Sequence, residues 1–171
     1  MAEILYRPIT LADVQTTRQM RLDALRDHLE AFGSDYNDLL AAPANYWHDR
    51  VAASFEGKTA RVIVAESNGE LAGMAGVIQD QGAKVDHQAF IWGVYVRPAF
   101  RGRRVVDGMM RALIDWCGER KLRKVRLSAT TSNSAAIQAY QRVGFNVYGI
   151  EQEVIRVGYV YHDEVLMWRR I

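Results

Sequence analysis

A short basic stretch, Arg101-Gly102-Arg103-Arg104-Val105-Val106, contains the residue types that most directly suggest chemistry. It follows an apolar run that ends at Pro98 and precedes a run with the spacing of a helix. Backbone N–H groups at the start of a helix have no partner within the helix, and the helix dipole is positive there, so anionic oxygens are favoured. The stretch therefore predicts a phosphate-binding loop. The alternative is a solvated basic patch.

A second stretch, from Asn133 to Phe145, places two polar side chains seven positions apart, at Asn133 and Tyr140. Seven residues make about two helical turns, so the two side chains share one face of a short predicted helix. An amide can hydrogen-bond a ligand, and a phenol can donate a proton. The alternative for Tyr140 is a core tyrosine whose hydroxyl reaches the surface.

Composition limits the other possibilities. A chain of 171 residues with 49% hydrophobic residues predicts one domain over residues 1–171. The formal charge of +2 and the lack of a groove-reading motif argue against a nucleic-acid partner. The N-terminus lacks a signal-peptide pattern, and no apolar run reaches the roughly 18 residues of a membrane span, so we expect a cytoplasmic protein without a membrane partner. Cys117, the single cysteine, has no metal-ligand pattern around it, so we expect inert packing and no metal.

The first half of the chain predicts a strand, two helices and a hairpin. The strand covers residues 4–7, and the first helix begins with a capping-box pattern at Thr10 and ends near Gly33, with Leu11 and Leu29 on its apolar face. The second helix follows Pro43 and ends at residues 56–57, and it buries Trp47, Val51 and Phe55. Two apolar runs, residues 61–66 and 71–79, flank Asn68-Gly69, which is a strong hairpin signal.

The second half predicts four more strands and two helices. Strands are expected at residues 89–96, 124–130, 145–155 and 164–170, with a turn near Gly158 between the last two. A short helix over residues 133–143 ends at Gly144. A longer helix covers residues 105–116, and these of its residues point inward: Val106, Met109, Met110, Leu113 and Trp116.

The order of these elements predicts an α/β (α+β) domain. Its central sheet is mixed, mostly antiparallel, of about seven strands, and about four helices flank it. The strand at residues 89–96, the helix at residues 105–116 and the strand at residues 124–130 form a parallel crossover.

Two sequence blocks, residues 91–106 and 133–145, together resemble the GNAT superfamily of acyl-CoA-dependent N-acyltransferases. The resemblance extends in element order over essentially the whole chain. It implies a GNAT-like domain that binds acetyl-CoA as co-substrate and transfers the acetyl group to a primary amine by direct attack in a ternary complex. Residues 30–36 and 161–167 are also similar to a bacterial subset of the superfamily whose acceptors are mostly unassigned.

The resemblance also assigns roles to residues. A strand that separates from its neighbour offers free backbone groups to the amides of the pantetheine arm, and the basic loop binds the pyrophosphate. Asn133 hydrogen-bonds the end of the pantetheine, and Tyr140 stands near the sulfur as the candidate general acid. The residues implied to bind the cofactor are Val94, Tyr95, Val96, Arg101, Gly102, Arg103, Arg104, Val105, Val106 and Asn133.

The basic loop departs from the family pattern at two positions. The pattern is Arg or Gln, two residues of any type, Gly, any residue, then Gly or Ala. Arg104 stands where the first glycine belongs, and Val106 stands at the final position. The Arg104 side chain could point outward and contact phosphate, narrow the loop and weaken binding, or abolish binding. We favour the first two together.

The general base and the acceptor pocket are less defined by the sequence. The attacking amine must lose a proton, and residues 89–96 contain no carboxylate. The remaining candidate bases are Glu30, Asp35, His87, Glu151, Asp163 and Glu164. Aromatic side chains that could line an acceptor pocket, or belong to the core, are Phe32, Tyr36, Trp47, Trp92 and Tyr95.

An acetyl-CoA-dependent N-acetyltransferase acting on a small-molecule amine is therefore the leading hypothesis. One alternative is a protein N-terminal or lysine acetyltransferase. Another is a non-catalytic, regulatory domain of the same fold that binds acyl-CoA, because Arg104 and Val106 depart from the loop pattern. The two C-terminal strands carry apolar residues that could extend a sheet across a homodimer.

Overall fold

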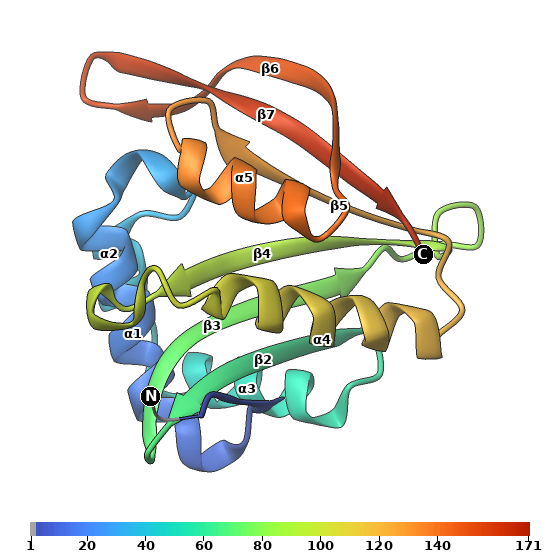
Figure 1. The fold of residues 1–171 in the computed structure, drawn as a ribbon. Coiled ribbons are helices and arrows are strands. Elements are labelled where there is room, and N and C mark those ends of the chain that lie inside the picture. Colours follow the sequence, from blue (N-terminus) through green and yellow to red (C-terminus); the bar gives the residue numbers. More distant parts are fainter. Residues whose placement is uncertain (1–2) are drawn as a thin grey trace.

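The computed structural model describes residues 3–171, which build a seven-stranded sheet in the order β1-β2-β3-β4-β5-β7-β6 (Figure 1). The strands are β1 (Leu5–Pro8), β2 (Ala60–Ser67), β3 (Glu70–Gln79), β4 (Gln88–Val96), β5 (Lys124–Thr130), β6 (Asn146–Val157) and β7 (Val160–Arg170). All neighbouring strands are antiparallel except β4 and β5, which are parallel. The predicted mixed, mostly antiparallel sheet and its central parallel crossover are confirmed.

Helices cover both faces of the sheet. They are α1 (Val14–Asp27), α2 (Tyr36–Leu40), α3 (Ala44–Glu56), α4 (Val105–Glu119) and α5 (Ser134–Arg142). α4 and α5 lie on one face, and α1 and α3 lie on the other (Figure 1). Successive side chains of a strand point to opposite faces, so Ile63 and Ala65 pack under α4 while Val62 and Val64 pack under α1 and α3.

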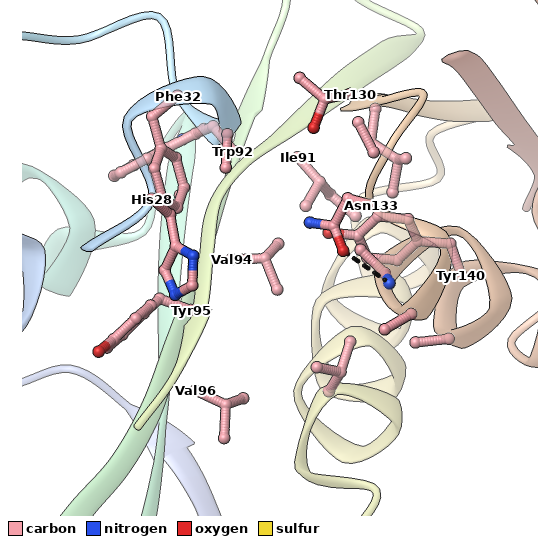
Figure 2. A pocket seen from close by; sticks show the side chains of 18 of the residues that line it. His28, Phe32, Ile91, Trp92, Val94, Tyr95, Val96, Thr130, Asn133 and Tyr140 are labelled. Atoms are coloured by element: carbon pink, nitrogen blue, oxygen red, sulfur yellow. Dashed lines mark hydrogen bonds between the residues drawn. The ribbon is translucent and has the colours of Figure 1, made fainter. Parts of the chain in front are cut away.

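The sheet opens between β4 and β5. These strands pair only where Gln88, Ala89 and Phe90 meet residues 124–126, and β4 then continues to Val96 without β5 beside it. β5 pairs with β7 along its whole length instead. Val94 and Val96 therefore face α5 across an opening (Figure 2). The separation of the two strands that the family resemblance implies is confirmed.

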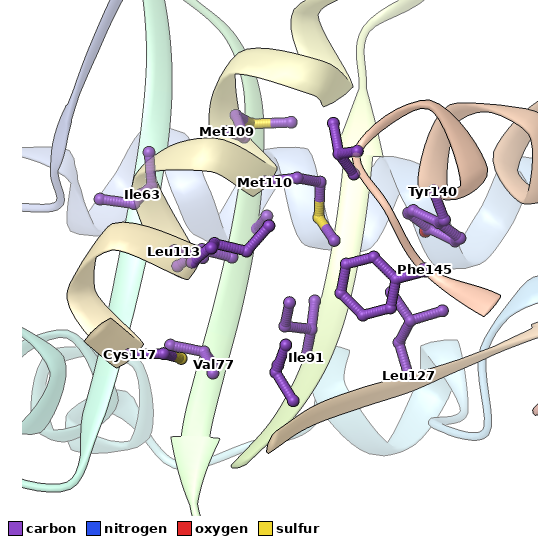
Figure 3. Packing of buried hydrophobic residues seen from close by; sticks show 14 of the residues in the cluster. Ile63, Val77, Ile91, Met109, Met110, Leu113, Cys117, Leu127, Tyr140 and Phe145 are labelled. Carbon is purple, nitrogen blue, oxygen red and sulfur yellow. The ribbon is translucent and has the colours of Figure 1, made fainter. Parts of the chain in front are cut away.

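The larger core lies between α4 and the sheet. Figure 3 shows Met110, Leu113 and Cys117 of α4 packed over Val77 and Ile91. Cys117 is fully buried, and this burial raises the pKa of its thiol to about 12. A thiol with so high a pKa is unreactive at neutral pH, as expected for inert packing.

Two helix boundaries differ from the sequence prediction. The first helix stops at Asp27 because His28 leaves the helical region, with φ −140°. A 3-10 turn, Leu29–Ala31, follows, so Leu29 is exposed and Gly33 does not end the helix. Leu11 is also exposed, in a 3-10 turn that precedes α1. The predicted apolar face does not extend to Leu11 or Leu29 because a 3-10 turn does not keep the 3.6-residue period of an α-helix.

Helix α2 was not predicted. Its signal is Asp35, whose carboxylate accepts hydrogen bonds from the backbone N–H groups of Asn37 (2.7 Å) and Asp38 (3.2 Å). An aspartate at this position is a strong helix start. The five helices thus include one more than the four expected, and β7 begins at Val160, earlier than the predicted residue 164.

One expectation about burial was wrong, and another was met only in part. Phe55 is 53% exposed because the buried face of α3 consists of Trp47, Val51 and Ser54. One residue further along a helix is a rotation of about 100°, which carries Phe55 out to solvent. Val106 is half-buried and packs against the larger core, while its neighbour Val105 is fully buried.

Within residues 3–171, no helix has the length and apolar character needed to cross a membrane. The same residues bring together no group of three or more His, Cys, Asp or Glu side chains suited to a metal ion.

Candidate active site

The opening between β4 and β5 is a cleft of about 970 Å³. β4 forms one wall, and β5 and α5 form the other, while the start of α4 closes one end. Pockets that bind small molecules are typically about 300–1,000 Å³, so this cleft is at the large end of that range.

A bulge in β4 sorts its side chains between the two faces. The pairing with β3 shifts between Met74 and Gly76, and Gly93 there has φ +64°. The extra residue of a bulge changes the alternation of side chains along the strand. Val94 therefore points toward α5, while Trp92 and Tyr95 both lie on the opposite face, beside His28 and Phe32 (Figure 2).

Beyond Phe90, the edge of β4 that faces the cleft has no partner strand. An extended ligand can pair with such an edge as an added strand would. Val94, Tyr95 and Val96, the residues predicted to bind pantetheine, all line the cleft along this edge. The Val96 carbonyl also accepts a hydrogen bond from Arg101 Nε (3.1 Å).

The basic loop keeps the helix start that a phosphate site needs. α4 begins at Val105, and its first residues, 105–107, line the end of the cleft, where the N–H groups of a first helical turn are available to a ligand. Arg104 occupies the N-cap position of this helix. Its φ of 56° and ψ of 29° lie in the left-handed region, which glycine adopts without steric strain. The glycine of the family pattern thus has a conformational reason, and Arg104 adopts the same conformation with its side chain exposed.

The arginines of the loop have different surroundings. Arg101 turns back over β4, where Nη2 lies 2.9 Å from Nε2 of His28. Since a guanidinium only donates, Nε2 of His28 accepts in this contact. Arg103 stands over the Phe100 ring, 5.5 Å from its centre, and does not contribute to the lining of the cleft.

Helix α5 presents Asn133 and Tyr140 to the cleft, on one face as the spacing predicted. Asn133 caps the helix, and its Oδ1 accepts from the backbone N–H of Ala136 (3.2 Å). This bond directs the Nδ2 donor of Asn133 toward the cleft (Figure 2). Tyr140 is buried, and its burial raises the pKa of the phenol well above 10.

Thr130, at the end of β5, was not singled out from the sequence. Its Oγ1 is buried and has no hydrogen-bond partner among the described residues. Thr130 also lines the cleft. An unpaired buried hydroxyl is costly, so a bound water or a ligand group is expected to complete it. Together with the free edge of β4 and the start of α4, Thr130 fits a ligand with amides along its length and phosphates at one end.

Of the candidate bases, only Glu30 and Glu164 line the cleft. Two others have structural roles: Asp35 caps α2, and Asp163 accepts a hydrogen bond from the backbone N–H of Glu153 (2.9 Å). His87 and Glu151 do not belong to the lining. The geometry therefore brings two of the candidate bases to the site, while a third carboxylate of the lining, Asp107, is paired with Arg142.

The aromatic candidates also separate. Phe32, Trp92 and Tyr95 line the cleft, whereas Trp47 lines a smaller cavity beside it, and Tyr36 lines neither. Three further residues of the site were missed: Arg21, His28 and Arg50. Arg21 left a signal in the sequence, since it is a charged residue among the buried positions of α1.

Residues 21–145, which include the β4 edge, the basic loop, Asn133 and Tyr140, match the family model described as the acetyltransferase (GNAT) family. The chain belongs to the acetyltransferase (GNAT) family. The resemblance stated from the two sequence blocks is thereby confirmed, together with the class of enzyme, an N-acetyltransferase, and its co-substrate, acetyl-CoA.

Other members place this GNAT domain among proteins with different acceptors. A Bacillus subtilis (strain 168) protein, provisionally named a ribosomal protein bS18-alanine N-acetyltransferase, is 24% identical over 88% of this chain and 92% of its own. YncA of Salmonella typhimurium, solved with its cofactor acetyl-CoA, is 20% identical with a TM-score of 0.82, over 99% of this chain and 94% of its own. Spermidine N-acetyltransferase of Vibrio cholerae, solved with CoA and spermine, is 15% identical with a TM-score of 0.79, over 98% of this chain and 95% of its own.

Proposed function

We propose that this GNAT protein transfers the acetyl group of acetyl-CoA to a primary amine on a small molecule, by direct attack in a ternary complex. The observation that carries the proposal is the cleft, which offers a different surface on each face of β4. Val94, Asn133 and Tyr140 lie on the face of α4 and α5, and Phe32 and Trp92 lie on the face of α1. Two substrates can thus meet at one strand edge.

The proposed binding of acetyl-CoA uses the β4 edge and the basic loop. The backbone of Val94, Tyr95 and Val96 pairs with the pantetheine amides, while Asn133 Nδ2 and Thr130 Oγ1 supply further hydrogen bonds. The loop from Arg101 to Val106 holds the pyrophosphate through the start of α4 and the guanidinium groups. The exposed side chain of Arg104 supports the outward orientation that adds a phosphate contact.

The proposed chemistry uses a carboxylate as the general base and Tyr140 as the general acid. Acetyl-CoA supplies the thioester, whose carbonyl is activated for attack. Glu30 or Glu164, directly or through water, takes the proton from the ammonium so that the nitrogen can form the new C–N bond. Tyr140 donates its proton to the sulfur as the C–S bond breaks, and the second proton that the nitrogen loses on becoming an amide restores the Tyr140 phenol, directly or through water. The raised pKa of Tyr140 keeps its phenol protonated throughout the neutral range, so the proton is present when the sulfur leaves, although the same shift makes the phenol a weaker acid.

The purified protein, acetyl-CoA and a panel of primary amines test the proposal through the release of free thiol. Calorimetry with acetyl-CoA and with CoA addresses one alternative to a small-molecule enzyme, and a comparison of peptides with small amines as acceptors addresses the other. Tight binding without turnover of any amine would indicate a non-catalytic acyl-CoA-binding domain. Faster turnover of peptides with a free N-terminus or lysine than of small amines would indicate a protein acetyltransferase, as the name of the Bacillus subtilis relative suggests for that protein.

We also propose a cytoplasmic homodimer. β6 is an edge strand of the sheet, and it exposes apolar side chains, with Ile150 61% exposed and Val147 48% exposed. An exposed apolar edge strand favours pairing with a second copy. Sedimentation of the purified protein reports the mass in solution.

A further inference from the structure

We propose that the acceptor is an amine that carries a carboxylate one or two carbons away, and that Arg21 binds this carboxylate with help from Arg50. The inference rests on the proposed function and narrows its acceptor to an amino-acid-like class.

Arg21 is a buried cation without a carboxylate. It is 9% exposed, and its Nη1 has no hydrogen-bond partner among the described residues. Its Nη2 makes one long hydrogen bond, 3.4 Å, to Oγ of Ser34, and its guanidinium stacks 4.5 Å from the centre of the Phe32 ring. An arginine fork in this position can bind a carboxylate with two parallel hydrogen bonds.

The unfavourable burial of the Arg21 charge is reflected in the pKa of its guanidinium group. Loss of hydration, together with the charge of the nearby Arg50, lowers the pKa of Arg21 to about 10. The group still carries its charge at neutral pH. A buried, unpaired charge destabilises a fold, so a ligand that pairs with it offers a reason for its presence.

The cavity beside Arg21 favours an anion. It has a volume of about 60 Å³ and adjoins the main cleft through Arg21, Arg50 and Trp92. No aspartate or glutamate belongs to the described residues that line it. Trp47 also lines it, with an indole N–H that is buried and unpaired. Two cations and a free donor around so small a space suit a group of a few atoms, such as a carboxylate.

The location of Arg21 connects this cavity to the reaction. Arg21 Nη1 lies 4.0 Å from the position that a Cβ would occupy on Gly93, the bulged residue of β4. Gly93 precedes Val94, where the proposed pantetheine path begins. A carboxylate on Arg21 therefore holds an amine on a neighbouring carbon beside the strand edge. A polyamine would instead bring positive charge toward two guanidinium groups, and the α-carboxyl group beside a protein N-terminus carries no charge because it forms the peptide bond.

Matched acceptors test the inference in the wild-type enzyme. Each L-amino acid is compared with its own carboxamide, which keeps the amine and the side chain but removes the negative charge. We expect the preferred amino acid to exceed its amide in kcat/KM by about 10- to 100-fold, the range of a hydrogen-bonded charge pair. Equal turnover of acids and amides would overturn the carboxylate site while leaving the acetyltransferase proposal intact.

Variants then assign the preference to Arg21. Arg21→Met should reduce the acid-to-amide ratio to within about threefold, while Arg21→Lys, which keeps the charge without the fork, should give an intermediate ratio. Arg18→Met, three residues earlier on α1 and outside both cavities, is the control and should keep the full ratio. An equal loss of kcat for acids and amides in Arg21→Met would indicate a role at the reacting carbonyl and would contradict the inference.

Thermal melting gives a readout that does not need turnover. Without ligand, Arg21→Met should melt no lower than the wild type, because it removes an unpaired buried charge. N-acetyl amino acids should raise the melting temperature of the wild type but not of Arg21→Met. If N-acetyl amino acids stabilise only the wild type and no amine is acetylated, the carboxylate site is supported and the proposed reaction is contradicted. If they stabilise neither protein, the carboxylate site fails.

Discussion

Arg104 holds a backbone conformation that most residues with a side chain avoid. Its φ of 56° places it in the left-handed region, where a Cβ crowds the following carbonyl. Val106, the other departure from the family pattern, lies within α4, where a Cβ causes no strain. The two departures therefore differ in consequence, and Arg104 is the one that matters for the loop.

Replacing Arg104 with glycine should have opposite effects on stability and on binding. Arg104→Gly should stabilise the fold by roughly 1 kcal/mol because strain is relieved. It should also weaken acetyl-CoA binding about threefold to tenfold because a phosphate contact is lost. Denaturant unfolding and calorimetry measure the two effects. Arg104→Lys is the control, because it keeps both the charge and the strain; tighter binding by Arg104→Gly would mean that the arginine obstructs the loop.

Tyr140 should control turnover without controlling the affinity for the cofactor. Tyr140→Phe removes only the hydroxyl, so we expect kcat to fall by about 10²- to 10⁴-fold, the usual contribution of a general acid. Calorimetry should give an unchanged Kd for acetyl-CoA. Tyr148→Phe, on an exposed position of β6, is the matched control. Full activity of Tyr140→Phe would remove Tyr140 from the mechanism.

At the scale of elements, α4 holds the loop against the sheet by close packing at one glycine. A Cβ on Gly108 would lie 2.0 Å from the ring of Tyr6 on β1, whereas a Cβ on Gly118 would lie 3.8 Å from its nearest neighbour, Ile171. α4 can therefore approach β1 only because Gly108 has no side chain. The same helix thus offers one glycine that packing requires and one that it does not.

The two glycines should respond to alanine in opposite directions. Gly118→Ala should stabilise the fold by up to about 1 kcal/mol, because alanine favours a helix. Gly108→Ala should destabilise it by about 1–3 kcal/mol, because the ring of Tyr6 must move. Denaturant unfolding of both variants measures the difference. Equal stabilisation by both substitutions would show that α4 does not need this close contact.

α4 is also tied to α5 by the pair of Asp107 and Arg142. Two hydrogen bonds of 2.7 and 3.1 Å join the side chains, and Asp107 is buried. The pair compensates a negative charge in the first turn of α4, close to the proposed phosphate site. Hydrogen bonding from Arg142 lowers the pKa of Asp107 below its usual 3.8.

This lowered pKa predicts a loss of stability in acid. When the pKa of a carboxyl group is lower in the folded state than in the unfolded state, the ionised group stabilises the fold at any pH above the unfolded-state pKa. This contribution is lost as the pH falls through the folded-state pKa. We expect Asp107→Asn to melt lower than the wild type at pH 7, and the difference to shrink below pH 3.8. Asp115→Asn, on an exposed position of α4, should show no such trend. A constant difference across the pH range would contradict the role of the pair.

At the scale of the whole molecule, regular periodicity made most of the fold predictable. The Asn68-Gly69 turn, the long apolar face of α4 and the crossover to β5 each carry a local signal, and each was found where the sequence indicated. Residues 28–33 were wrongly predicted as helix, and residues 34–43 were not assigned, because a 3-10 turn and a five-residue helix have no sustained period. The same region forms part of the acceptor side of the cleft.

For a related reason, the cofactor side of the site was predictable from the sequence and the acceptor side was not. The cofactor side depends on a backbone edge and a helix start, which leave patterns in a continuous stretch of sequence. The acceptor side depends on Arg21, His28 and Arg50, which come from three separate segments and meet only after folding. The significance of Arg21 in particular lies in the absence of a carboxylate near it, and only the folded molecule reveals this.

Amine-dependent release of thiol from acetyl-CoA by the purified protein tests the central claim most directly. We predict that release depends on the amine, saturates with both substrates, and falls by at least about 100-fold in Tyr140→Phe. Saturable binding of acetyl-CoA with no release of thiol in the presence of any amine would contradict the assignment of this cleft as an acetyltransferase site.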